Sequence, residues 1–271
     1  MSALPEELPP LSTVRVQRWI DGRVEQASDQ VAEEQPVALV YQGMPHVVML
    51  ATPADLADLG LGFTLSEAIV AAPTEVRALR VHSAEGGIEV HIDIPGERLA
   101  ALLHRQRNLS GRTGCGLCGA ASIAQAIRHP DPVGAGVEIS STELHAALAE
   151  LHARQPLNAR SGSVHAAAWA QPGTGLQLVR EDVGRHNALD KVLGALLRAG
   201  LEPASGYLVI TSRASYEMVL KAATLGVTLL AAVSAPTGLA IRLALEAGLS
   251  LVGFARAHRH VVYSHPQRLR P

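Results

Sequence analysis

The stretch Tyr207–Phe254, YLVITSRASYEMVLKAATLGVTLLAAVSAPTGLAIRLALEAGLSLVGF, decides the fold class. Short apolar segments in it are typical of strands, and longer amphipathic segments between them are typical of helices. The expected strands are 207–211, 229–233 and 249–254, and the expected helices are 215–225 and 238–247. Because strands that alternate with helices form parallel pairs through crossover connections, the stretch predicts an α/β layer with a largely parallel central part.

Further from this stretch, the pattern changes near residues 130–140. On the C-terminal side we expect a helix that begins at Ser141, strands at 165–170 and 176–179, a helix at 187–199 and a last strand at 261–263. On the N-terminal side we expect a disordered lead-in at 1–12, two strand-like pieces around Gly43-Met44-Pro45, a helix from Pro53, a β-hairpin at 76–94, and helices at 97–106 and 120–128. The sequence therefore predicts two domains, a smaller α+β domain at 13–135 and an α/β domain with a mixed sheet at 136–271.

The composition indicates a well-buried globular protein. Hydrophobic residues make up 48% of the 271 residues and charged residues 18%, which argues against disorder. The net charge of −2 does not suggest a nucleic-acid binder. We find no signal-peptide pattern and no apolar run of transmembrane length. Because two cysteines cannot form a disulfide framework, we expect a soluble protein of the reducing cytoplasm with no membrane partner.

The only two cysteines form the motif Cys115-Gly116-Leu117-Cys118 in a glycine-rich stretch. Glycine permits positive φ, so the stretch can expose both sulfurs, and a helix that begins just after Cys118 would favour a thiolate. A CxxC pair indicates redox chemistry, half of a zinc site or a sulfur carrier. No second CxxC or CxxH supplies further zinc ligands, so we expect no structural metal. Two buried small apolar residues are the remaining alternative, although so much glycine makes a poor core.

The run Arg180–Lys191, REDVGRHNALDK, places seven charged or histidine residues between an apolar strand and an apolar helix face. The carboxyl end of a strand that leads into a helix is where α/β folds bind ligands. Asp182, His186 and Asp190 are spaced i, i+4, i+8 and would share one face of a helix that extended back that far. A salt-bridged helix start explains the same residues equally well.

Two hydroxyl-rich turns follow the next strands, at 211–217 and 234–238. Each offers side-chain hydroxyls and free backbone N–H groups to an anion, and each also fits ordinary helix capping. The segment Phe254–Arg259 leaves an apolar strand with two guanidinium groups, which bind phosphates well. A solvated basic tail is the alternative for this C-terminal segment, in which no acidic residue occurs after Ala247.

Together these pieces resemble the FdhD family of formate dehydrogenase accessory sulfurtransferases over roughly residues 35–268. The matching pieces are Thr52-Pro53, Asp58-Leu59-Gly60, Gly62-Phe63, CGLCG at 115–119, REDVGRHNALDK at 180–191, RASYEM at 213–218 with Lys221, SAPT at 234–237 and LVGFAR at 251–256. The long run at 180–191 is highly specific, whereas CxxC alone is not. Two departures stand out, Ser161-Gly162-Ser163 before His165-Ala166, where the family usually has a Gly pair, and Thr211-Ser212-Arg213, where Ser-Gly-Arg is common.

The resemblance implies a sulfurtransferase. A cysteine desulfurase would pass persulfide sulfur to Cys115, with Cys118 as an assistant or second carrier. The protein would then deliver sulfur to bis-molybdopterin guanine dinucleotide for formate dehydrogenase. The residues expected to bind this cofactor are Phe254, Ala255, Arg256, Ala257, His258, Arg259, Arg185, His186 and Arg213. The resemblance also implies a homodimer and a cytidine-deaminase-like fold for residues 136–271.

Two other functions are compatible with this pattern. A cofactor-binding chaperone without sulfur chemistry would use the same cations but would not need Cys115. A zinc-dependent deaminase-like hydrolase would use a His-x-Glu motif, which His165-Ala166-Ala167 resembles. Ala167 stands where that motif has its general acid/base, and the CxxC lies upstream of it, so we reject this second alternative.

Overall fold

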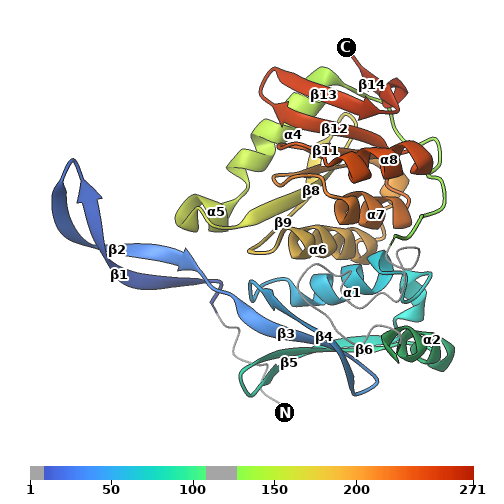
Figure 1. The fold of residues 1–271 in the computed structure, drawn as a ribbon, viewed down its shortest axis with the longest axis horizontal. Coiled ribbons are helices and arrows are strands. Elements are labelled where there is room, and N and C mark those ends of the chain that lie inside the picture. Colours follow the sequence, from blue (N-terminus) through green and yellow to red (C-terminus); the bar gives the residue numbers. More distant parts are fainter. Residues whose placement is uncertain (1–8, 108–126) are drawn as a thin grey trace.

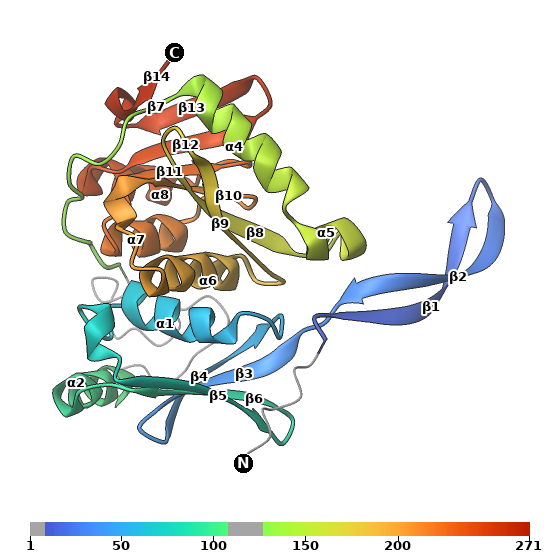
Figure 2. The same cartoon turned by 180° about the vertical axis from the view of Figure 1, so that it is seen from behind.

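The computed structural model describes residues 9–107 and 127–271, and consists of two stacked lobes with a projecting hairpin arm (Figures 1 and 2). The N-terminal lobe runs from β3 to α2, and the C-terminal lobe from β7 to β14. Helix α1 of the first lobe packs against helix α6 of the second. No helix in the described ranges is both long and apolar enough to cross a membrane. The domain division at 135/136 stays a prediction.

The N-terminal lobe is a four-stranded sheet covered by a helix. Its strand order is β4-β3-β6-β5, in which β3 and β6 are parallel and the other pairs antiparallel. The strands are β3 Gln35–Tyr41, β4 Met44–Ala51, β5 Ala78–Ala84 and β6 Gly87–Asp93; the helices are α1 Leu56–Ser66, the 3₁₀ turn η1 Pro73–Glu75 and α2 Gly96–Arg107. Leu59 and Leu65 of α1 pack with Leu39, Val90 and Ile92 of the sheet, which forms one core.

The C-terminal lobe is built on a six-stranded mixed sheet with the order β13-β12-β11-β10-β8-β9. The strands are β8 His165–Gln171, β9 Gly175–Asp182, β10 Tyr207–Ile210, β11 Leu229–Ala232, β12 Ser250–Arg256 and β13 Arg259–Ser264. The three central strands β10, β11 and β12 are parallel, as the sequence predicts, and the flanking pairs are antiparallel. A short pair, β7 Ile139–Ser140 and β14 Leu269–Arg270, lies beside it.

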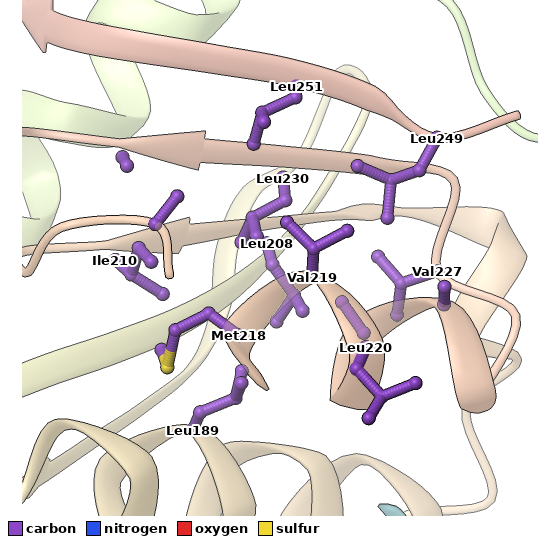
Figure 3. Close-up of a cluster of buried hydrophobic side chains, with 14 of the residues drawn as sticks. Leu189, Leu208, Ile210, Met218, Val219, Leu220, Val227, Leu230, Leu249 and Leu251 are labelled. Carbon is purple, nitrogen blue, oxygen red and sulfur yellow. The ribbon is translucent and has the colours of Figure 1, made fainter. Parts of the chain in front are cut away.

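Helices cover both faces of this sheet. One face carries α4 Ser141–Ala153, which leads into α5 Pro156–Ser161, and the other carries α6 Arg185–Arg198, α7 Tyr216–Thr224 and α8 Gly238–Ala247, with 3₁₀ turns η2 Pro203–Ser205 and η3 Pro266–Arg268 in the connections. Alternate residues of β10 point to opposite faces, so Leu208 packs in the core under α6–α8 and Val209 in the core under α4. Figure 3 shows the first of these cores, where Leu189 of α6 and Met218 of α7 meet the strands.

The arm consists of β1 Leu11–Ile20 and β2 Arg23–Ala32; its base contacts α5, where Arg160 donates to Gln30, and its tip projects away from both lobes (Figures 1 and 2). Asp21 and Gly22 make the turn with φ of 50° and 77°, the left-handed backbone that Asp-Gly hairpins adopt. We did not predict this hairpin, although Asp-Gly between apolar residues is its usual signal. The expectation of a disordered lead-in at 1–12 was wrong at its end, because β1 begins at Leu11; residues 1–8 lie outside the described residues.

The helices and strands expected elsewhere in the described residues are confirmed to within a few residues. Helix α5 and the short strands β7 and β14 were not predicted. The helix expected to begin at Ser141 has a capping box: the Glu143 N–H donates to Ser140 Oγ, and Glu143 accepts from the Ser140 N–H. The helix expected at 120–128 lies almost wholly outside the described residues. The likeness of residues 136–271 to cytidine deaminases stays a prediction.

Two glycines allow α1 and α6 to pack backbone against backbone. A Cβ built on Gly194 would lie 1.9 Å from the carbonyl oxygen of Asp58, and one on Gly62 would lie 1.8 Å from that of Asp190. Only glycine fits at either position, because the atoms that would have to move are main-chain atoms of the other lobe.

We therefore expect Gly194→Ala to lower the free energy of unfolding by about 3 kcal/mol, the cost of forcing two packed helices apart. Urea unfolding followed by circular dichroism measures it. Gly96→Ala is the matched control, because a Cβ at that helix position meets nothing within 4 Å. Equal stability of the two variants would contradict this account of the interface.

Candidate functional site

The strand directions bring nearly all the candidate segments outside the cysteine motif to one edge of the six-stranded sheet. Strands β9, β10, β11 and β12 end at this edge, and β8 and β13 begin there. We call it the carboxyl edge, formed by His165, 182–186, 211–217, 234–238 and 254–259. In α/β folds this is the side on which ligands bind.

Backbone hydrogen bonds hold the segments of the carboxyl edge in fixed relation. The Thr211 N–H donates to the carbonyl of Ala166, beside His165, at 3.0 Å. The Thr237 N–H donates to Ala214 at 3.0 Å, which links the two hydroxyl-rich turns. The Phe254 N–H donates to Ser234 at 3.1 Å, so the edge is continuous from β8 to β12.

Much of the run at 180–191 holds the two lobes together. The Asp182 carboxylate is fully buried, 2.6 Å from Lys191 Nζ, and it also accepts from the N–H groups of Thr52 and Gly184 and from the Asn187 amide. Lys191 Nζ donates in turn to the carbonyl of Thr52 at 3.0 Å. Arg180 and Arg198 both bind the buried Asp58 of α1; these contacts are 2.8 and 2.6 Å long.

A second buried cluster centres on Lys221 of α7. Its ammonium lies 2.9 Å from Asp190 and 3.0 Å from Glu67 at the end of α1. Ser66 accepts from Lys221 and donates to Asp190, at 2.9 and 2.7 Å. Burial opposes the charge on Lys221, but Asp190 and Glu67 outweigh it and raise the pKa of this lysine.

The expectation that Asp182, His186 and Asp190 share one helix face was wrong. Helix α6 begins only at Arg185, so Asp182 lies at the end of β9. Each of the three has a different partner: Lys191 for Asp182, Glu217 for His186 and Lys221 for Asp190. The alternative interpretation, a helix start held by ion pairs, describes Asp182 and Asp190 correctly.

Arg185 and His186 remain at the carboxyl edge beside His165. His186 Nε2 lies 2.6 Å from a carboxylate oxygen of Glu217 of α7, and this close contact lowers the pKa of Glu217 despite its burial. Burial lowers the pKa of His165, and the nearby Arg185 and His186 lower it further. These influences outweigh the opposing effect of Asp182 and favour the neutral imidazole, which can both donate and accept a hydrogen bond.

Several donors at this edge have no partner within the described residues. The Arg185 Nε and the Ser215 hydroxyl are buried without a hydrogen-bond partner. Helix α6 has no side-chain cap at Gly184, and helix α7 has none at Ser215, whereas Thr237 caps α8. Two uncapped helix N-termini, a guanidinium and a hydroxyl that converge on one edge fit an anion. The sequence offers the hydroxyls of the turn at 211–217 to an anion or to helix capping, and the Ser215 hydroxyl makes no capping hydrogen bond.

The segment Phe254–Arg259 forms the end of β12, a turn and the start of β13. Phe254 has a φ of 49° and is 39% exposed, and Arg256, His258 and Arg259 are also exposed. Ala255 is fully buried in the core under α4, so its side chain faces away from this surface. Arg268, which belongs to the basic C-terminal segment, is buried and donates to the carbonyls of Gly134, Ala135 and Gly248.

Cys115 and Cys118 lie outside the described residues, as do the glycines around them. Ile127, the first described residue after this segment, lines a cavity of about 390 Å³ between α7 and α8. The cavity is lined by Ile127, His129, Tyr216, Leu239, Arg242, Leu243 and Glu246. Its walls are mostly apolar and its His129 and Glu246 bind each other at 2.8 Å, so the unpartnered donors, which lie at the carboxyl edge, mark the better candidate site.

Comparison with known proteins assigns the family, because the model described as the FdhD/NarQ family matches residues 32–270. The chain belongs to the FdhD/NarQ family. Relatives named "Sulfur carrier protein FdhD" from Xanthomonas euvesicatoria pv. vesicatoria and Cupriavidus necator are 55% and 52% identical to it over 261 and 263 residues. The matches cover 96% and 97% of this chain and 93% and 91% of the relatives. The family resemblance predicted from the sequence is thus confirmed.

A solved structure shares the fold. It is a crystal structure from Desulfotalea psychrophila, described as that of a formate dehydrogenase accessory protein. The TM-score is 0.73 at 23% identity, and the match covers 96% of this chain and 100% of that one. The fold of this chain, with both lobes, therefore also occurs in an experimental structure of another protein.

The ion pairs between the lobes predict how stability depends on pH. Burial opposes ionisation of Glu67, but Lys221 and Arg128 outweigh burial and lower its pKa from 4.5 to about 2. A carboxylate with a lowered pKa stabilises the fold above its unfolded pKa, and this contribution is lost as the pH falls from 4.5 toward 2. We expect Glu67 to contribute up to about 3 kcal/mol of this loss.

The variant Glu67→Gln should show a shallower fall of the unfolding free energy between about pH 5 and pH 3 than the wild type. Urea unfolding at several pH values measures the slopes. Glu85→Gln, in the exposed turn between β5 and β6, is the control and should leave the slope unchanged. An unaltered slope in Glu67→Gln would refute the assignment.

Proposed function

We propose that this chain is a sulfur carrier that activates the molybdenum cofactor of formate dehydrogenase. The observation that carries the proposal is the 52–55% identity, over nearly the whole chain, to relatives named sulfur carrier proteins. The chain supplies the chemistry through Cys115 and Cys118, its only thiols. The donor is a cysteine desulfurase and the recipient is formate dehydrogenase, so the protein acts as a sulfurtransferase.

Sulfur uptake is an exchange between persulfide and thiolate. The Cys115 thiolate attacks the terminal sulfur of the donor's persulfide, a new S–S bond forms, and the donor cysteine leaves as a thiolate with the electron pair. Release uses the second cysteine. When the Cys118 thiolate attacks Cys115 Sγ, a disulfide forms and the terminal sulfur leaves as HS⁻ for the molybdenum. A cellular thiol then reduces the disulfide.

The carboxyl edge is the proposed binding surface for the substrate cofactor, bis-molybdopterin guanine dinucleotide. Arg185, His186 and Arg213 lie along the edge, and Arg256, His258 and Arg259 extend it at the β12–β13 turn. The buried and unpartnered Arg185 Nε and Ser215 Oγ suit phosphate oxygens, because a guanidinium and a hydroxyl both donate to them.

Two alternatives differ in what they require of the cysteines. A cofactor-binding chaperone would use the same carboxyl edge but would work without Cys115. A deaminase-like hydrolase would need an acid at the position of Ala167, which is instead a fully buried alanine of β8. The first alternative is the one that the experiment below has to exclude.

We also propose that the protein is a homodimer and acts in the cytoplasm. The exposed tip of the arm supports self-association, since a two-stranded hairpin without further cover is marginally stable in water. Trp19 at its tip is 70% exposed and Ile20 is 51% exposed, and burial against a second copy would remove both from water. A reducing cytoplasm keeps both cysteines available as thiols between turnovers.

Intact-protein mass spectrometry after incubation with a cysteine desulfurase and cysteine tests the carrier. We expect the wild type to gain one or more sulfur atoms that a reductant removes, and Cys115→Ser to gain none there. Cys118→Ser should load sulfur but release it more slowly to formate dehydrogenase. If the wild type gains no sulfur beside an active desulfurase control, the carrier proposal falls and the chaperone remains.

Guanosine diphosphate serves as a probe for the carboxyl edge, because it carries the guanine and diphosphate of the cofactor. Arg185→Gln should weaken its binding roughly tenfold through the loss of charged hydrogen bonds to phosphate. Isothermal titration calorimetry gives the affinities. Arg18→Gln, on the exposed arm, is the matched control for the lost charge. Unchanged affinity in Arg185→Gln would place the cofactor elsewhere.

A further inference from the structure

Three histidines meet where α4 lies against the β12–β13 hairpin. The ring of His145, on α4, contacts those of His258 and His260, with centroid distances of 6.3 and 5.2 Å. His145 Nε2 also lies 3.1 Å from His260 Nδ1, a hydrogen-bonding distance. Burial lowers the pKa of His260, and the nearby His145 lowers it further, which favours the neutral imidazole that such a bond requires. The contact joins the helix on one face of the sheet to the hairpin at the carboxyl edge.

The hairpin has a bulge at the point where His145 reaches it. Two residues of β12, Phe254 and Ala255, lie opposite His260 alone, because the regular register shifts there. Phe254 takes a left-handed φ of 49° at the bulge. Its N–H donates to the Ser234 carbonyl at 3.1 Å, so the bulge is held on one side by the backbone that follows β11 and on the other by His145.

The tip of the hairpin beyond the bulge is strained. Arg256 and Arg259 lie directly opposite each other and are both exposed, and like charges at such a position repel. His258, in the two-residue turn, has a left-handed φ of 66°, which favours glycine. An anion between the two guanidinium groups would relieve the repulsion, and backbone strain of this kind is typical of binding sites. Side chains alternate along β13, so Arg259 points away from the face on which His260 meets His145.

Helix α4 gives His145 a fixed position. Leu144, the residue before it, is fully buried in the core under α4. The start of the helix is held by the capping box of Ser140 and Glu143. His145 therefore offers His260 a rigid partner, whereas the ladder of backbone hydrogen bonds in the hairpin is interrupted by the bulge.

We propose that His145 is a positioning residue of the cofactor site: its hydrogen bond to His260 holds the hairpin so that the two opposed arginines can bind one phosphate group together. The inference rests on the proposed cofactor surface at the carboxyl edge. His145 belongs to α4, on the face of the sheet away from the arginines, so it acts through the hairpin and not on the ligand. Guanidinium groups that are already in place lose less freedom on binding, and a fixed hairpin therefore binds an anion more tightly.

The test measures the affinity for guanosine diphosphate, by isothermal titration calorimetry, in three variants of α4. His145→Leu removes the hydrogen bond, and its affinity should fall about fivefold, the worth of one neutral hydrogen bond. Glutamine can both donate and accept, so His145→Gln should bind within about twofold of the wild type. His152→Leu, an exposed position farther along the same helix, is the matched control and should bind as the wild type does.

A double-mutant cycle with Arg256→Gln tests whether His145 acts through the hairpin. Each single change should weaken binding of guanosine diphosphate. In the Arg256→Gln background, His145→Leu should cost less than about twofold, because an arginine that is absent cannot be misplaced. Urea unfolding followed by circular dichroism confirms that every variant is folded under the conditions of the titration.

The outcomes separate this role from the proposals on which it rests. Unchanged affinity in His145→Leu overturns the role of His145, as does an equal loss in His145→Gln or His152→Leu, or the full fivefold loss in the Arg256→Gln background. A wild type that does not bind guanosine diphosphate would refute the proposed cofactor surface, and the role of His145 with it. A wild type that binds it but takes up no sulfur would refute the carrier function alone.

Discussion

The fully buried ion pair between Asp182 and Lys191 is the interaction on which the arrangement of the molecule depends. Two buried charges are stable together only when their remaining hydrogen-bonding groups are satisfied, and here the backbone of Thr52 satisfies both of them. Thr52 belongs to the N-terminal lobe, whereas Asp182 and Lys191 belong to the C-terminal lobe. Neither lobe can bury its part of this site without the other, so assembly of the two lobes and folding of the β9–α6 connection are one event.

Because buried charges have to be paired, the residues of the motif REDVGRHNALDK fall into a structural group and a candidate binding group. Within REDVGRHNALDK, the charged side chains at the contact with α1 are all paired: Arg180 with Asp58, Asp182 with Lys191, and Asp190 with Lys221. These pairs hold the start of α6 in place. Arg185 and His186, at that beginning, are left at the carboxyl edge beside His165. The structural residues thereby determine the direction of the helix N-terminus and of the guanidinium that we assign to phosphate. A sequence pattern that marks a binding site can thus consist mainly of residues that never touch a ligand.

The sequence alone predicts the order of elements well, because 3.6-residue and two-residue apolar periods and turn residues are local signals. It also predicts that strand ends gather functional residues, since parallel connectivity places them on one edge. It does not predict that Asp190 pairs with Lys221 or that Arg198 pairs with Asp58, because such partners are chosen by packing between distant segments. For the same reason it does not predict that the Ser215 hydroxyl is left without a partner, or that the Tyr216 hydroxyl bonds both the N–H and the carbonyl of Arg128. The β1–β2 hairpin was predictable from the sequence, because Asp21-Gly22 is a common hairpin turn, but we did not predict it.

The glycine contact between α1 and α6 has a mechanical meaning. Where Gly62 and Gly194 meet, there is no layer of side chains that could change rotamer and let one helix slide over the other. The contact between α1 and α6 is rigid and cannot act as a hinge. The ion pairs around it also resist rotation of one lobe against the other. The sulfur transfer that we propose would require the reactive thiol to reach two different partners. In this molecule that travel cannot come from opening and closing of the lobes at α1 and α6.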